Sequence, residues 1–374
     1  MSQGLHASDK SNSKWLELQA QLARLPSRLP ASAQSLAPQQ IADQIRQLSN
    51  YYIHSPSAVS PWHEPWARHA LFSYYHPLNL TRVWAAAERG RHLGFLNDLH
   101  HLYDLGSGSG AAAQALSLQQ SWTSLELRDV SSAILEFALQ VAELPSHTRH
   151  TTARLETRPQ NLDDPRRSLA VLAHVLTENT EIPSWVFELE ALMILEPSTR
   201  DDARRLQARR ETLMAQGFHI WAPCPHAKPC PLLRDERDWC HDAIEYPAPP
   251  WWLDLEAHLP MKNQRLTFSY LLARKTPPPA PSSRPLLRVV GDVLAEKGKS
   301  RTLTCSDGDR AFLSWFPNRR QSPEPTCRRG DLLEWPSAPT NFEKRGQDER
   351  QEWRIGDADF PILSQLPDRN DSNR

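Results

Sequence analysis

The chain has 374 residues, and 39% of them are hydrophobic, which is enough for two ordinary domains or one large one with a substantial core. Its 43 Lys and Arg balance 44 Asp and Glu, and the formal net charge of -1 excludes a global field that would recruit nucleic acid or an anionic membrane. No run approaches the length of about 18 apolar residues that a transmembrane helix needs, and the amino terminus shows no secretory signal. The expected location is therefore cytoplasmic, where thiols stay reduced.

Residues 1–98 are predicted to form a helical amino-terminal region. Apolar side chains recur every three or four residues over 14–25 and 39–51, and further helical patterns cover 70–75 and 78–96. The pattern changes near residue 99, where this region ends.

From residue 99 to 275 short apolar runs alternate with helical patterns, which is typical of βα units around a mostly parallel sheet. An α/β, Rossmann-like domain is therefore predicted. The expected strands are 101–105, 122–128, 151–155, 169–173, 192–195, 218–221 and 267–273. The expected helices are 110–120, 131–144, 184–190 and 200–216, the last with Thr199 as its cap and Gly217 as its stop.

Two proline-rich segments interrupt or end this domain. An insertion at 222–266 contains three Cys, and a loop of that length without secondary structure is uncommon unless it is functional or held by something other than packing. The run TPPPAPSSRP at 276–285 predicts a semi-rigid spacer and a domain boundary.

Beyond the spacer, residues 286–320 are predicted to form a small basic β module, with an Asp-Gly turn at 307–308 between two of its strands. Residues 284–320 contain eight Lys or Arg and four Asp or Glu, which makes this the most basic segment of the chain. From 321 to 374 the sequence is polar and aperiodic, which predicts a disordered tail.

A glycine-rich turn follows the first strand of the predicted α/β domain. The run YDLGSGSG places Gly106, Gly108 and Gly110 before a helix, with Asp104 two positions before the first glycine. Glycine lets the backbone turn tightly and approach a ligand, and a helix amino terminus presents free N–H groups. The register differs from the dinucleotide fingerprint G-x-G-x-x-G and resembles motif I of class I methyltransferases, which bind S-adenosylmethionine.

A second acid fits the same pattern. Asp129 stands at the end of the next predicted strand after the one that carries Asp104, and a helical pattern follows it. The resemblance implies that Asp104 lies near the methionine end of the cofactor and that Asp129 holds its ribose hydroxyls. Glu126 is the competitor for the second role, but it falls inside the strand. The alternative is that the glycines only form a tight strand-to-helix turn; the second acid and the βα order favour cofactor binding.

The five cysteines are not evenly spread. Cys224, Cys230 and Cys240 lie close together in the proline-rich insertion, whereas Cys305 and Cys327 are remote. The C-x₂₋₄-C knuckle typical of structural zinc is absent. Four dispersed thiolates around a larger object fit an iron–sulfur cluster better, and unrelated buried thiols are the alternative.

Several motifs together resemble the methyltransferase-like family associated with the small ribosomal subunit, whose members occur in bacteria and mitochondria. They are FSYYHPLNL, DLGSGSG, LEPST, APCPHAKPCPL, DWCH and FSYL, spread over residues 70–320. The resemblance implies a Rossmann-like class I methyltransferase domain and a [4Fe–4S] cluster held by Cys224, Cys230, Cys240 and Cys305, with Cys327 left as a free thiol. The chain departs from the family where LPMKNQRLTFSY replaces an acidic run and LTE replaces LNE.

The sequence therefore predicts a methyltransferase-like factor that binds S-adenosylmethionine and acts in assembly or translation of the small ribosomal subunit. Its expected partners are the small subunit or its precursor and ribosomal RNA, contacted by Lys and Arg of 284–320 together with Lys262 and Arg265. No membrane partner is expected. Two alternatives stay open: an active ribosomal RNA methyltransferase, with His174 or Glu178 as general base, and a small-molecule methyltransferase whose Cys loop binds zinc.

Overall fold

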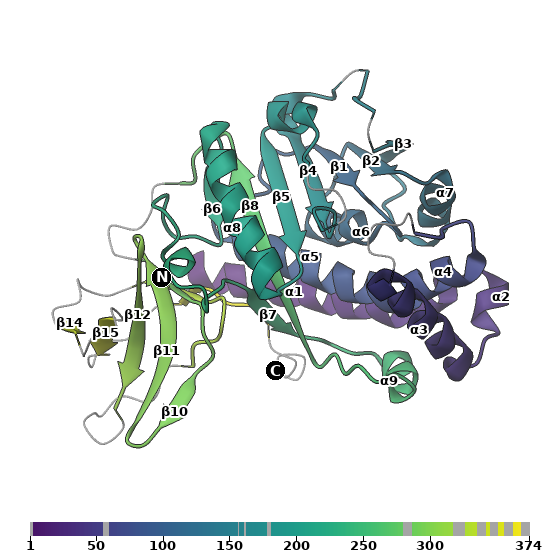
Figure 1. The fold of residues 1–374 in the computed structure, drawn as a ribbon. Helices are drawn as coiled ribbons and strands as arrows, with labels where there is room; N and C mark the ends of the chain where they lie inside the picture. The colour runs from purple at the N-terminus through teal and green to yellow at the C-terminus, as the bar shows by residue number, and fades with distance from the viewer. Residues whose placement is uncertain are drawn as a thin grey trace.

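The computed structural model describes most of the chain. The described residues are 3–54, 60–155, 157–160, 162–177, 181–279, 286–316, 326–334, 342–344, 351–354 and 362–367. Figure 1 shows two sheets in this part of the chain, with amino-terminal helices alongside the larger one.

The part of the chain that precedes the larger sheet is helical. It consists of α1 (Gln3–Arg24), η1 (Leu25–Arg28), α2 (Ala31–Gln34), α3 (Pro38–His54), α4 (Pro65–Ala70), the π-helical segment η2 (Leu71–Tyr75) and α5 (His76–Arg91). Trp15, Leu18 and Leu22 follow helical spacing on α1 and are completely buried. They belong to the same hydrophobic core as one face of the larger sheet, so this region packs as part of the α/β body.

The larger sheet has the strand order β3-β2-β1-β4-β5-β8-β6, with β7 paired to β8. Strands β1 to β5 are parallel, and β8 is antiparallel to both β5 and β6. The predicted α/β, Rossmann-like class is confirmed. The bounds are β1 (His101–Leu105), β2 (Ser124–Asp129), β3 (Arg149–Arg154), β4 (Ser168–Ala173), β5 (Ala191–Glu196), β6 (His219–Ala222), β7 (Asp242–Glu245) and β8 (Arg265–Arg274).

Side chains of the central strands alternate between two cores. Met193 and Leu195 of β5 join the core that contains the amino-terminal helices, whereas Leu192 and Ile194 join the core beneath α8. This is the period of two expected for a strand buried on both faces. The helices of the domain are α6 (Ala111–Gln119), α7 (Ser132–Val141), the short η3 (Pro165–Arg167) and η4 (Ser184–Glu188), and α8 (Arg200–Ala215).

The cysteine-rich insertion contains regular structure that its prolines conceal. It forms η5 (Pro231–Arg234), strand β7 and helix α9 (Pro250–Ala257) before the chain returns in β8. Pro250 occupies the first turn of α9, where its missing N–H has no intrahelical partner to lose.

A second sheet begins after the spacer, with the strand order β14-β15-β12-β11-β9-β13-β16 and β10 paired to β11. It lies beside the insertion at the lower left of Figure 1. Its strands are β9 (Leu286–Val289), β10 (Leu294–Glu296), β11 (Lys299–Ser306), β12 (Asp309–Trp315), β13 (Leu332–Glu334), β14 (Phe342–Lys344), β15 (Gln351–Arg354) and β16 (Ile362–Ser364). The predicted turn is present, with positive φ at Asp307 and Gly308.

Within 321–374, where the sequence predicts a disordered tail, the parts that the structure describes instead form short strands. There β13 pairs with β9 and β15 pairs with β12, so the tail completes the sheet. The physical reason is that β9 and β12 would otherwise present open edges, which short strands cover even without sequence periodicity. Residues 280–285 of the predicted spacer lie outside the described residues.

A buried ion-pair network joins the helices, the insertion and the second sheet. The Arg89 guanidinium on α5 donates from Nε and Nη2 to the Asp242 carboxylate, at 2.9 and 3.1 Å, and from Nη1 to Asp331 at 3.2 Å. The Arg288 guanidinium on β9 donates to the same Asp242 at 3.4 Å. Because these side chains come from α5, β7, β9 and the segment before β13, the network fixes the second sheet against the α/β body.

Candidate functional site

The glycine-rich turn connects β1 to α6 in a left-handed conformation. Gly106, Gly108 and Gly110 have φ of 66°, 51° and 79°. At Gly106 a Cβ would lie 2.5 Å from Cγ2 of Val175, whereas at Gly108 its nearest neighbour would be at 3.8 Å. Gly106 is thus required by crowding and backbone conformation together, whereas Gly108 is required by backbone conformation alone, because a Cβ there would meet its nearest neighbour at an ordinary contact distance.

The two predicted acids lie on either side of this turn. The Asp104 carboxylate accepts a hydrogen bond from the Ala113 N–H at 3.0 Å, and that of Asp129 accepts from the Gly108 N–H at 3.0 Å. Burial raises the pKa of Asp104 to about 7, and the charge of Asp129 adds to the increase. Glu126, the competitor for the second role, instead pairs with Arg128 on its own strand.

The π-helical segment and the start of α5 cover the turn. Leu71 supplies the atom nearest to the position of a Gly108 Cβ. The buried His76 ring lies between Ser109 Oγ, at 2.9 Å from Nδ1, and Gln114 Oε1, at 3.1 Å from Nε2. Burial lowers the pKa of His76 to about 4, so it is neutral at physiological pH. Single π turns inside helices are frequent at functional sites, and the sequence offered no signal for this one.

Two polar residues end β4 and β5 at the same edge of the sheet. His174 has φ of 62°, which is uncommon for a residue other than glycine. The buried Glu196 carboxylate accepts from the Leu176 N–H at 2.9 Å, and burial raises its pKa to about 7. Glu178, the other candidate base, lies outside the described residues.

The structure brings four of the five cysteines together. Cys230, Cys240 and Cys305 pack in one small hydrophobic cluster, and Cys224 is close enough for its charge to affect Cys305. Cys305 Sγ also lies 3.5 Å from His226 Nε2. Cys327 lies elsewhere, in the core of the second sheet with Leu333, and is not in an exposed tail.

Burial disfavours ionisation of three of these thiols, those of Cys224, Cys230 and Cys305. Burial raises the pKa of Cys224 to about 12, and the neighbouring Cys230 and Cys240 add to the increase while Arg210 opposes it. Burial, followed by the charges of the other three cysteines, raises the pKa of Cys305 as well. Among the described residues, no group of three or more His, Cys, Asp or Glu is placed to hold a single metal ion.

Helix α8 holds the backbone of the cysteine-rich insertion. Arg204 donates to four carbonyl oxygens there, those of Leu232, Leu233, Asp235 and Asp238, at 2.9 to 3.4 Å. The fully buried Arg210 donates to the His226 carbonyl at 2.7 Å. Neither arginine was singled out by the sequence, because the helical pattern makes both look like ordinary surface charges.

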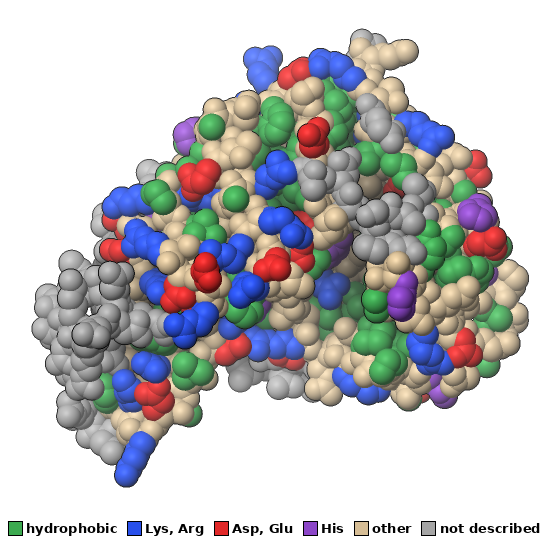
Figure 2. All heavy atoms as spheres, viewed as in Figure 1, with side chains coloured by type: hydrophobic (Ala, Val, Ile, Leu, Met, Phe, Trp, Pro, Cys, Tyr) green, Lys and Arg blue, Asp and Glu red, His purple; other side chains and the backbone are tan. Residues whose placement is uncertain are grey.

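The predicted RNA-contacting cations are largely engaged within the protein. Lys262 Nζ donates to the Glu256 carbonyl at the end of α9, and Arg265 pairs with Asp292 at 2.7 Å. Basic and acidic side chains are interspersed over the visible face in Figure 2. Arg284, Arg319 and Arg320 of the basic segment lie outside the described residues.

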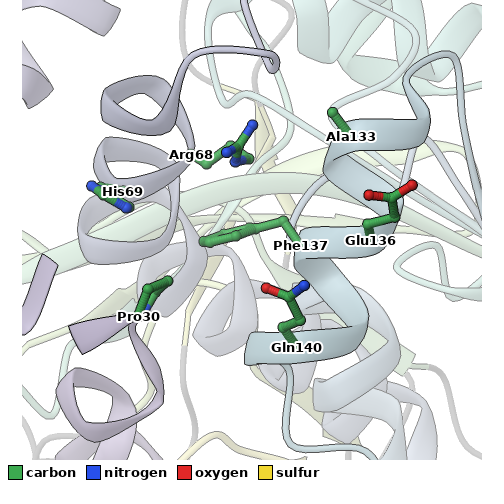
Figure 3. A pocket seen from close by; sticks show the side chains of 7 residues that line it. All are labelled: Pro30, Arg68, His69, Ala133, Glu136, Phe137 and Gln140. Carbon is green, nitrogen blue, oxygen red and sulfur yellow. The ribbon is translucent and has the colours of Figure 1, made fainter. Parts of the chain in front are cut away.

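A small surface pocket of about 140 Å³ lies between α4 and α7 (Figure 3). Arg68 lies over the Phe137 ring, 5.9 Å from its centroid. The predicted cofactor and cysteine residues do not line it; its lining is Pro30, Arg68, His69, Ala133, Glu136, Phe137 and Gln140.

The strand order, the antiparallel β8 and the turn after β1 define a class I methyltransferase fold. Residues 95–319 match a family model described as mitochondrial small ribosomal subunit Rsm22. Because this match covers more than half of the chain, the chain belongs to the Rsm22 family. The family description names the mitochondrion, so the cytoplasmic location expected from the sequence is not confirmed. No helix in the described part of the chain is both long and apolar enough to cross a bilayer.

Among curated proteins, none matches the chain significantly. Similar solved structures include a putative RNA methyltransferase of Pyrococcus horikoshii, with 15% identity and a TM-score of 0.32 over 51% of this chain and 84% of the other. Magnesium protoporphyrin IX methyltransferase of Synechocystis has 13% identity and a TM-score of 0.32 over 63% and 100%. Precorrin-6y C5,15-methyltransferase of Geobacter metallireducens has 16% identity and a TM-score of 0.30 over 50% and 88%.

Proposed function

We propose that this protein is a methyltransferase-like factor of the small ribosomal subunit that binds S-adenosylmethionine and a [4Fe–4S] cluster. Membership of the Rsm22 family supports the ribosomal assignment. The cluster is supported by four cysteines that lie close together, three from the insertion and one from the second sheet. The cofactor is supported by the left-handed glycine turn between two acids.

The cofactor would lie on the turn formed by Gly106, Gly108 and Gly110, with Asp104 and Asp129 on either side. Backbone N–H groups at the start of α6 and a turn with glycine at three of its positions suit close approach of a nucleoside. The Asp129 carboxylate, which accepts from the Gly108 N–H, is held where ribose hydroxyls could donate to it. S-adenosylmethionine, when bound, supplies an electrophilic methyl group.

Isothermal titration calorimetry of Gly108→Val tests this site. A branched side chain on the turn, in a left-handed backbone position where a Cβ meets no closer neighbour than Leu71 at 3.8 Å, should abolish binding while the fold persists. Unchanged affinity for S-adenosylmethionine in the variant would contradict the assignment.

The donor set of the cysteine cluster fits an iron–sulfur cluster better than zinc. Four thiolates at about 2.3 Å from one zinc ion stand about 3.8 Å apart. An iron–sulfur cluster has its own sulfides and spreads its thiolate ligands more widely, which suits cysteines that come from both the insertion and the second sheet. Cys224, Cys230, Cys240 and Cys305 would hold the cluster, and the buried Arg210 and Arg288 would offset part of its negative charge.

Iron analysis after anaerobic purification tests the cluster and its fourth ligand. Cys230→Ser and Cys305→Ser should lose the brown absorbance and most of the iron, whereas Cys327→Ser, a matched change in the core of the second sheet, should keep both. A wild type with stoichiometric zinc refutes the cluster. Normal iron in Cys305→Ser with loss in Cys327→Ser refutes the ligand assignment.

The proposed partner is the small subunit or its precursor, contacted through ribosomal RNA. The tagged protein should co-sediment with free small subunits, and association should weaken with salt because phosphate contacts release counterions. Salt-independent association would argue against RNA as the contact. The same particles distinguish a binding factor from an active ribosomal RNA methyltransferase, because only the latter transfers labelled methyl groups to precursor RNA.

A further inference from the structure

Near the end of β4, Arg82 lies close enough to two polar side chains from distant parts of the chain, His174 and Tyr246, to interact with both electrostatically. Arg82 comes from α5, His174 from the end of β4 and Tyr246 from the segment after β7. Within the described part of the chain, Arg82 Nε, His174 Nε2 and the Tyr246 hydroxyl are all buried without a hydrogen-bond partner. Figure 2 shows a hollow on this face below the carboxyl ends of the parallel strands, with Lys or Arg atoms at its floor.

The charge of Arg82 acts on both of the other side chains. Burial, followed by the charge of Arg82, lowers the pKa of His174 to about 3, so the imidazole is neutral. Burial raises the pKa of Tyr246, while Arg82 acts in the opposite direction. The hydroxyl, the neutral imidazole and the guanidinium can each donate a hydrogen bond, and the guanidinium can only donate.

The charge of Arg82 is not balanced by an acid within the described part of the chain. Its guanidinium donates from Nη1 to the Asn79 side-chain oxygen at 3.0 Å, and no ion pair among the described residues involves it. Glu256, the carboxylate whose charge affects Tyr246, already accepts from the Asn263 N–H at 2.6 Å. Buried cations and buried donors normally have partners, so this arrangement is short of an anion.

We propose that Arg82, His174 and Tyr246 form an anion subsite that receives the α-carboxylate of S-adenosylmethionine. The inference rests on the proposed cofactor site and adds residues to it. An Arg fork matches a planar carboxylate, and bonds to a charged group are stronger than neutral ones. The left-handed backbone of His174 is a strained conformation of the kind that persists at binding sites.

Both a carboxylate on a small ligand and an RNA phosphate are anions that could accept from these donors. The burial of the subsite favours the carboxylate. Tyr246 is completely buried, and its ring lies 5.1 Å from that of Trp252, which also stacks on Tyr74 at 5.2 Å. A single carboxylate on a small ligand suits so enclosed a position better than the larger backbone of a nucleic acid. The glycine turn adjoins the end of β4, since a Cβ on Gly106 would lie 2.5 Å from Cγ2 of Val175, the residue after His174, so the amino-acid end of a cofactor on this turn would be near the subsite.

Calorimetry with two ligands that differ only in the carboxylate tests the proposal. Wild type, Arg82→Gln and the control Arg91→Gln on the same helix are titrated with S-adenosylmethionine and with its decarboxylated form. Arg82→Gln should weaken binding of the first by about tenfold or more and change binding of the second by less than about twofold. Tyr246→Phe, which removes only a hydroxyl, should show the same pattern more weakly, and it keeps the test available if Arg82→Gln does not fold.

The remaining outcomes separate the subsite from the cofactor site. If the wild type binds S-adenosylmethionine and Arg82→Gln leaves that affinity unchanged, or weakens both ligands equally, the subsite is refuted while the proposed function stands. If Arg82→Gln instead weakens binding of a ribosomal RNA fragment alone, the anion is a phosphate and the inference is overturned. A wild type that binds neither ligand overturns the cofactor site and the subsite together.

Discussion

Replacing Arg89 by Met should separate the second sheet from the α/β body at a large cost in stability. The Arg89 side chain is 2% exposed and its partners Asp242 and Asp331 are 0% and 1% exposed. Arg89 also donates to the Ser364 carbonyl at 3.0 Å. The variant keeps the apolar stem but leaves Asp331 without its cation and Asp242 with Arg288 alone, and removing one partner of a buried pair costs about 3–5 kcal/mol.

That loss would be about a fifth or more of the total for a protein whose free energy of unfolding is about 5–15 kcal/mol. Urea unfolding followed by tryptophan fluorescence measures it, and Arg158→Met is the control because its pair with Glu188 is about half exposed and should be worth less than about 1 kcal/mol. Adding Asp242→Asn to Arg89→Met should recover part of the loss. A loss below about 1 kcal/mol in Arg89→Met would refute the reasoning.

Three further predictions concern the candidate sites. Gly106→Ala, whose Cβ would lie 2.5 Å from Val175 Cγ2, should lower the melting temperature more than Gly298→Ala, whose Cβ meets nothing within 4 Å. The folded-state pKa of Asp104, about 7, lies above its unfolded value, so its contribution to stability is present below about pH 4 and is lost as the pH rises through 7. Cofactor binding that favours the charged form of Asp104 should release a proton from its carboxyl group below pH 7. Calorimetry in two buffers detects this proton release, and Asp104→Asn should abolish it. Arg204→Met should reduce retained iron with every thiol intact, measured against protein concentration.

The α/β domain could be predicted closely because its local signals agree with its tertiary structure. The strand at His101–Leu105 has the predicted bounds, and α8 begins as expected, with the Thr199 side chain accepting from the Asp202 N–H. In both cases apolar periodicity and a cap or turn residue point to the same element. The cysteines could also be grouped, since three of them are close in sequence.

What the sequence could not indicate depends on partners that are remote along the chain. Strand β7 lies within a proline-rich segment and exists because β8 pairs with it. The short strand β13 is held by β9. Arg82 and Tyr246 are far apart in the sequence, and neither stands in a motif, so only the fold reveals that they meet. These features depend on tertiary pairing, and the local sequence pattern does not predict them.

The position of β8 between β5 and β6 affects the order in which the nascent chain can fold. Strand β5 ends at Glu196, but its partner β8 begins only at Arg265, and the chain between them takes several seconds to make at a synthesis rate of about 5–20 residues per second. During that interval β5 has an open edge, and β6 has no neighbour to pair with. Cys224 likewise leaves the ribosome well before Cys305 has been added to the chain. A group that requires all four thiols can therefore enter only after the second sheet has begun to emerge.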